Sequence, residues 1–70
     1  MTSTEHMEWA KKRALVYVDR GELRDAVASM ISDLGKHPDT ECPAFLGVAG
    51  MLASADGDAD FVRHWIEGFN

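Results

Sequence analysis

Apolar residues recur along this chain at intervals of three and four, which is the spacing of one face of an α-helix. The most regular stretch lies between Gly21 and Pro38, and its apolar positions are Leu23, Ala26, Val27, Met30, Ile31 and Leu34. Glycine and proline end helices, so we expect Gly21 to close the preceding element and Gly35 with Pro38 to stop this one. The pattern predicts an amphipathic helix over residues 22–36.

Two further stripes predict helices nearer the ends of the chain. The first helix is expected over residues 5–19, with the inner positions Met7, Ala10, Ala14, Tyr17 and Val18. Residues 1–4 before it are predicted to be disordered, with Ser3 or Thr4 as the N-cap. The last helix is expected over residues 59–67, with the apolar positions Phe61, Val62, Trp65, Ile66 and Phe69.

The stretch from Pro43 to Ser54 differs, because its apolar residues are not confined to one face. Proline suits the first position of a helix. Gly47 and Gly50 each lower helix stability by about 1 kcal/mol relative to alanine, which indicates close backbone approach or a loosely held helix. A helix that is apolar all round must be covered. Since a chain of 70 residues can hardly enclose it, we expect part of its surface to await a partner.

These elements predict one all-α domain over residues 1–70, built as two packed antiparallel hairpins, residues 5–36 and 43–67. Apolar residues make up 46% of the chain, which is typical of a folded protein. A faint internal repeat supports the pairing: Gly21 and Gly57, 36 positions apart, each precede an acidic residue and a helical stripe. Neither hairpin could bury its apolar face alone, so we expect them to stack.

The first hairpin resembles a single tetratricopeptide-type hairpin over residues 7–40. The resemblance is carried by Ala14, Tyr17, Gly21, Leu23, Ala26, Leu34 and Pro38. The second hairpin departs from that pattern, keeping only Gly50 and Gly57. An array that holds a peptide in a groove needs about three units. The resemblance therefore implies a tetratricopeptide-like helical domain rather than a repeat array.

The chain as a whole resembles small uncharacterised proteins encoded by tailed bacteriophages of actinobacteria. The segments "RALVYVDRGELRDAVASMISDLGKHPDT" and "VRHWIEGFN" carry this resemblance. It implies expression inside an infected bacterial cell and a binding role directed at the host. It brings no catalytic or ligand-binding residues with it.

The formal charge of −5 comes entirely from the second half of the chain. Acidic and basic residues cancel over residues 1–36, whereas residues 37–70 carry six acids against Arg63 alone. Such a bias disfavours binding to a phosphate backbone, although it could attract a basic partner. The basic run Lys11-Lys12-Arg13 is diluted by acids on the same helix, so we interpret it as a solvated face.

The segment Asp56-Gly57-Asp58-Ala59-Asp60 resembles the first ligand positions of a calcium loop. Such a loop needs glycine at its sixth position, where this chain has Phe61. We therefore interpret Asp58 or Asp60 as the N-cap of the last helix.

No other constellation of residues predicts chemistry. Cys42 is the sole cysteine, and with three scattered histidines it does not provide a structural zinc site. Its place before a proline at a helix start would stabilise a thiolate slightly. We predict no catalytic residue, no metal, no cofactor and no small-molecule substrate. Without an apolar signal core or a membrane-spanning run, the expected location is the cytoplasm, that of the host if the chain is phage-encoded.

The remaining hypotheses concern binding surfaces. The residues predicted to form an interface are Trp9, Phe45, Val48, Met51 and Phe69. The leading hypothesis is a protein-binding module that engages a host or viral protein through a helical surface. The alternatives are a homo-oligomeric structural protein and an acidic decoy of nucleic acid. The sequence also predicts that the protein does not bind a membrane.

Overall fold

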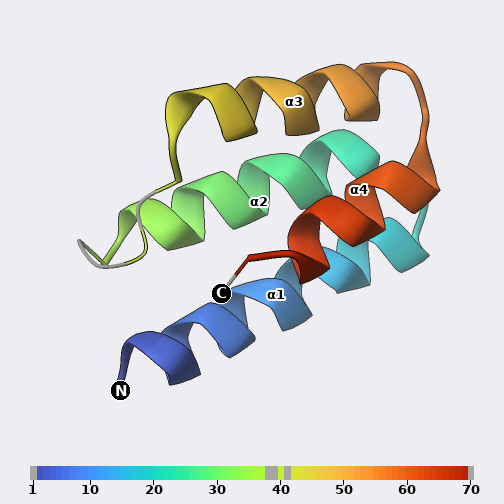
Figure 1. The fold of residues 1–70 in the computed structure, drawn as a ribbon. Coiled ribbons are helices and arrows are strands. Elements are labelled where there is room, and N and C mark those ends of the chain that lie inside the picture. Colours follow the sequence, from blue (N-terminus) through green and yellow to red (C-terminus); the bar gives the residue numbers. More distant parts are fainter. Residues whose placement is uncertain (1, 38–39, 41, 70) are drawn as a thin grey trace.

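The structure is a computed structural model, and it describes residues 2–37, 40 and 42–69. These residues form the helices α1 (Ser3–Asp19), α2 (Leu23–Gly35), α3 (Ala44–Ala55) and α4 (Ala59–Glu67), with no strand among them. The all-α class predicted from the apolar spacing is confirmed. Successive helices run antiparallel, and α2 lies between α1 and α3, as Figure 1 shows. Helix α4 contacts the other three helices, whereas α1 and α3 have no contact within the described part of the chain.

The two hairpin turns have the same structure. Gly21 and Gly57 adopt positive φ angles of 77° and 72°, a left-handed conformation that glycine reaches without strain. The N–H of Glu22 donates to the carbonyl of Tyr17 at 2.9 Å, and the N–H of Asp58 donates to that of Ala53 at 3.1 Å. Each bond closes the preceding helix in a Schellman motif. The internal repeat seen in the sequence is therefore a repeat of backbone geometry.

Helix α1 begins two residues earlier than predicted. Thr2 is its N-cap: the Thr2 hydroxyl accepts from the N–H of Glu5 at 3.1 Å, and the Thr2 N–H donates to the Glu5 carboxylate at 3.2 Å. This reciprocal capping box draws Ser3 and Thr4, which the sequence predicted to be disordered, into the first helical turn. Met1 lies outside the described residues.

Helices α3 and α4 begin at different kinds of cap. Pro43 is the N-cap of α3 with an extended ψ of 141°, so it precedes the helix instead of taking its first position. Asp58 is the N-cap of α4, and its carboxylate accepts from the N–H of Phe61 at 3.0 Å. The prediction that an aspartate of this segment caps the last helix is confirmed. Pro38, Asp39 and Glu41 lie outside the described residues.

The core lies where α1, α2 and α4 meet. Its buried apolar side chains are Met7, Ala10, Ala14, Val18, Ala26, Val27, Met30, Leu34, Ala53, Val62 and Ile66. Most belong to the predicted stripes, although Tyr17, Leu23 and Ile31 are only half-buried and Phe61 is exposed. Helix α3 contributes only Ala53 to this set. The most apolar helix of the chain is therefore the one least used by the core.

Helix α3 approaches its neighbours through its smallest residues. A Cβ atom on Gly50 would lie 2.8 Å from the ring of Trp65, and one on Gly47 would lie 3.5 Å from Ile31 Cδ1. The indole N–H of Trp65 donates to the carbonyl of Leu46 at 2.9 Å. The glycines thus serve close backbone approach, one of the two explanations that the sequence left open.

Candidate interaction surface

The face of α3 that points away from the rest of the molecule is apolar and exposed. Its large side chains are exposed by 73% for Phe45, 58% for Val48, 47% for Met51 and 63% for Leu52. The opposite side of the helix, with Gly50, packs on α2 and α4. In Figure 1, α3 forms one edge of the molecule, so no other helix covers this face.

Four residues of this face have the spacing that lets one helix pack against another. Phe45, Val48, Leu52 and Ala55 follow one another at intervals of three, four and three. Apolar residues at these intervals form a narrow seam along a helix, and such a seam fits between the side chains of a second helix. We call these four residues the α3 seam. Met51 lies beside it.

The internal repeat provides a comparison for this seam within the same chain. Subtracting 36 from the seam positions gives their counterparts in α1, which are Trp9, Lys12, Val16 and Asp19. Lys12 and Asp19 are exposed charges, and Val16 is exposed by 48%. The same hairpin geometry thus accommodates charged side chains at two of the four counterpart positions in α1. The apolar character of the α3 seam is therefore not required by the fold.

The five residues predicted to form an interface do not form one surface. Phe45, Val48 and Met51 share the outer face of α3. Trp9 lies half-buried on α1, which does not touch α3 in the described structure. Phe69 is also half-buried, with its ring edge-on to Trp65 at a centroid distance of 5.0 Å.

Two residues that the sequence reasoning left out, Leu52 and Ala55, complete the α3 seam. The signal for them was their spacing from Val48. Leu52 follows it by four positions and Ala55 by seven, so one helical face had to hold all three.

Trp9 belongs to a separate polar cluster between α1 and α2. The guanidinium of Arg13 lies 4.8 Å from the Trp9 ring centroid and the ammonium of Lys36 lies 5.8 Å from it, both within the range of cation–π attraction. The His6 ring lies 5.6 Å from the same indole. These contacts hold Trp9 against its own molecule.

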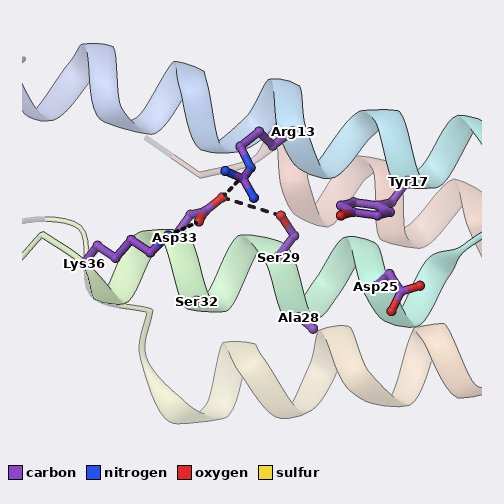
Figure 2. Close-up of a pocket in the computed structure, with 8 residues that line it drawn as sticks. All are labelled: Arg13, Tyr17, Asp25, Ala28, Ser29, Ser32, Asp33 and Lys36. Atoms are coloured by element: carbon purple, nitrogen blue, oxygen red, sulfur yellow. Dashed lines mark hydrogen bonds and ion pairs between the residues drawn. The ribbon is translucent and has the colours of Figure 1, made fainter.

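Asp33 is the centre of this cluster and is only 2% exposed. Its carboxylate receives Lys36 Nζ at 3.1 Å and Arg13 Nε at 3.3 Å, and the hydroxyl of Ser29 donates to it at 3.5 Å (Figure 2). Three donors from the same chain therefore compensate its burial. With its oxygens engaged in this way, the carboxylate holds α1 against α2.

His6 strengthens the same junction through the backbone. Its Nε2 lies 2.6 Å from the carbonyl oxygen of Asp33. A carbonyl can only accept, so this contact places a proton on Nε2. The polar hollow beside the cluster, bordered by Arg13, Tyr17 and Lys36, opens to solvent. Arg13 and Lys36, the two cations at its border, already contact Asp33, so their position there is explained by the ion pairs that they form within the chain.

The sequence-predicted chemical candidates are separated in space or engaged locally. One carboxylate oxygen of Asp58 accepts the capping hydrogen bond of α4. Within residues 2–37, 40 and 42–69, no three His, Cys, Asp or Glu side chains are arranged to hold a metal ion. Burial raises the pKa of the Cys42 thiol by desolvation, so the expectation of a stabilised thiolate is wrong.

No helix in the described part of the chain has both the length and the apolar character needed to cross a membrane. Comparison with known proteins gave no match to a protein-family model, to a curated protein or to a solved structure.

Proposed function

We propose that this protein is a small protein-interaction module that binds its partner through the α3 seam. The observation that carries the proposal is the exposure of Phe45, Val48 and Leu52 on one uncharged helical face. Contiguous exposed apolar surface on a small domain is typical of interaction sites. Support also comes from the two charged counterparts of the seam in α1, Lys12 and Asp19, because these indicate that the fold itself does not need apolar side chains at those positions.

The resemblance to proteins of tailed actinobacteriophages suggests where the partner is found. A product made inside an infected bacterium meets host proteins and other viral proteins. We therefore propose a partner of one of these two kinds.

Photocrosslinking in the infected host tests this function. Benzoylphenylalanine is placed at Val48 and, as the matched control, at its counterpart Lys12. We expect a discrete light-dependent adduct with another protein from position 48, absent from position 12 and removed when Leu52→Glu is added. No adduct at position 48, or the same adducts from both positions, would contradict the proposal.

A second candidate function is homo-oligomeric assembly through the same surface. It is favoured by the absence of any charged residue between Ala44 and Ala55, which lets two copies of α3 approach without repulsion inside the helix. Sedimentation velocity over a range of concentrations separates the two candidates. A dimer that Leu52→Glu dissociates would support self-assembly, and an adduct of twice the chain mass would agree with it.

A further inference from the structure

We infer that the partner segment seated on the α3 seam is an amphipathic helix with basic residues beside its apolar stripe. This inference rests on the proposed function and adds the chemistry of the partner. The intervals of the seam already indicate a helical occupant, because knobs spaced by three and four match the holes on another helix.

The charged residues around α3 indicate the sign of the charge expected on the partner segment. Helix α3 ends at Ala55, and the next residues carry the exposed carboxylates of Asp56, Asp58 and Asp60. Asp56 follows Leu52 by four positions, which places it at the end of the seam. A basic residue of the partner would meet these carboxylates as the apolar stripes come together.

The direction of α3 adds to this negative field. The C-terminus of a helix carries a partial negative charge, which cations stabilise and anions do not. Helix α3 has no basic residue in its last turn, and Asp56 is its C-cap. Asp56 therefore places a negative charge at an end of α3 where the helix dipole does not stabilise it. A cation supplied by a partner would be favoured by both the helix dipole and the aspartates.

The chain's own basic residues do not neutralise this region. Arg63 is the single lysine or arginine in residues 37–70, and its guanidinium lies 2.9 Å from Asp19. This hydrogen bond raises the pKa of Arg63, so its positive charge is paired with Asp19 of α1. Arg24 borders the hollow at the turn between α3 and α4, but Glu22 and Asp25 border the same hollow. The net charge along this edge remains negative.

The same charges argue against the other occupants of an apolar helix face. A second copy would bring its own formal charge of −5 and the same three aspartates to the interface. An anionic lipid surface would repel them as well. A basic amphipathic helix supplies both the apolar stripe and the opposite charge.

Designed peptides test the inference directly. Three fluorescent helices share one stripe of leucines at seam spacing, and their remaining positions combine alanine with lysine, glutamate or glutamine. Binding to the full chain is followed by anisotropy at low and high ionic strength. We expect the lysine peptide to bind about tenfold more tightly than the glutamate peptide, since three exposed charge contacts change sign between them. The difference should shrink at high salt.

Two matched variants separate seam binding from general attraction between opposite charges. Leu52→Glu makes the chain more acidic, so purely electrostatic binding of the lysine peptide would strengthen, whereas seam binding should be lost. Val16→Glu adds the same charge at the counterpart position of α1 and should leave the affinity unchanged within about twofold. Asp56→Lys should weaken the lysine peptide several-fold while raising the thermal stability of the free protein, because it places a cation at the end of α3.

Several outcomes would overturn the inference. If the lysine and glutamate peptides bound with equal affinity and Leu52→Glu abolished both, the inference of a basic partner would be wrong, whereas the proposed function would be unaffected. No binding of the lysine peptide would reject the inference outright. A Leu52-dependent dimer in sedimentation, or Leu52-dependent binding to vesicles of neutral phosphatidylcholine, would assign the seam to a second copy or to lipid. The proposed function itself fails if position 48 gives no adduct with another protein, and the dimer or vesicle result would also replace its proposed host or viral partner.

Discussion

A carboxylate withdrawn from water costs free energy unless donors and cations reach it. At Asp33 two cations and a hydroxyl do so, and both cations keep part of their surface in water. We expect Asp33→Asn to lower the free energy of unfolding by about 2 kcal/mol, because the amide loses the charge that orders Arg13 and Lys36. Urea unfolding followed by circular dichroism measures this.

The control for Asp33→Asn is Asp25→Asn on the exposed surface of the same helix. Its expected loss is about 0.5 kcal/mol, the contribution of an acid in the first turn of a helix. Equal losses in the two variants would show that the buried cluster contributes no more than a surface charge.

The raised pKa of Cys42 makes a prediction about its reactivity. The thiolate is the reactive form, and burial disfavours it. The rate of alkylation by iodoacetamide should therefore rise with pH with a midpoint above the ordinary thiol value. The same chain unfolded in urea should show the ordinary midpoint.

The upward direction of the pKa shift of Cys42 also determines its effect on stability. The folded state keeps the thiol proton to higher pH than the unfolded state does. The contribution of Cys42 to stability is therefore complete below the unfolded pKa and declines as pH rises through the folded pKa. A folded midpoint at or below the unfolded one would contradict this.

At the scale of the helices, Gly47 and Gly50 of α3 should respond oppositely to alanine. A Cβ on Gly50 would come within 2.8 Å of the Trp65 ring, so Gly50→Ala should destabilise the protein by about 1–3 kcal/mol. A Cβ on Gly47 finds ordinary contact at 3.5 Å from Ile31, so Gly47→Ala should stabilise by up to about 1 kcal/mol through helix propensity. Thermal unfolding of the two variants measures the difference. A stabilising shift from Gly50→Ala would show that α3 is not seated on Trp65 as described, and a destabilising shift from Gly47→Ala would contradict the ordinary contact with Ile31.

The sequence allowed the helices and turns to be predicted because their signals are local. Gly21, Gly57 and the Asp58 cap act through backbone atoms a few residues away. The orientation of α3 could not be predicted, because apolar residues surround it and periodicity gives no direction. The partners Trp65 and Ile31 are bulky, so the small residues of α3 turn inward and its large ones face outward. The inward orientation of the small residues therefore depends on tertiary contacts, which the periodicity of α3 does not contain.

The buried charge was missed for a different reason. An aspartate is ordinarily assigned to the surface, and the residue type alone does not mark Asp33 as an exception. Its spacing did: it follows Met30 by three positions and Ala26 by seven, so it lies on the inner stripe of α2. The cations that make its burial tolerable come partly from α1, which a reading of α2 alone could not supply.

At the scale of the whole molecule, the two hairpins share one core. The smallest extent of the molecule is 16 Å, which leaves room for about two layers of helices at 8–10 Å separation. Val62 and Ile66 of α4 are fully buried in the same cluster as the alanines of α1 and α2. The first hairpin therefore depends on α4 to cover its apolar face.

A shared core predicts that the hairpins unfold together, and the chain carries one tryptophan in each to test this. Trp9 lies on α1 and Trp65 on α4, so Trp65→Phe leaves a probe of the first hairpin and Trp9→Phe a probe of the second. Each variant is compared only with itself, because losing the indole bond of Trp65 to Leu46 alters stability. In both variants, the urea midpoints from tryptophan fluorescence and from helical dichroism should coincide, as expected for a small two-state domain. If the first hairpin were independently stable, the Trp9 signal would persist beyond the loss of part of the helical signal, and the single core described here would be contradicted.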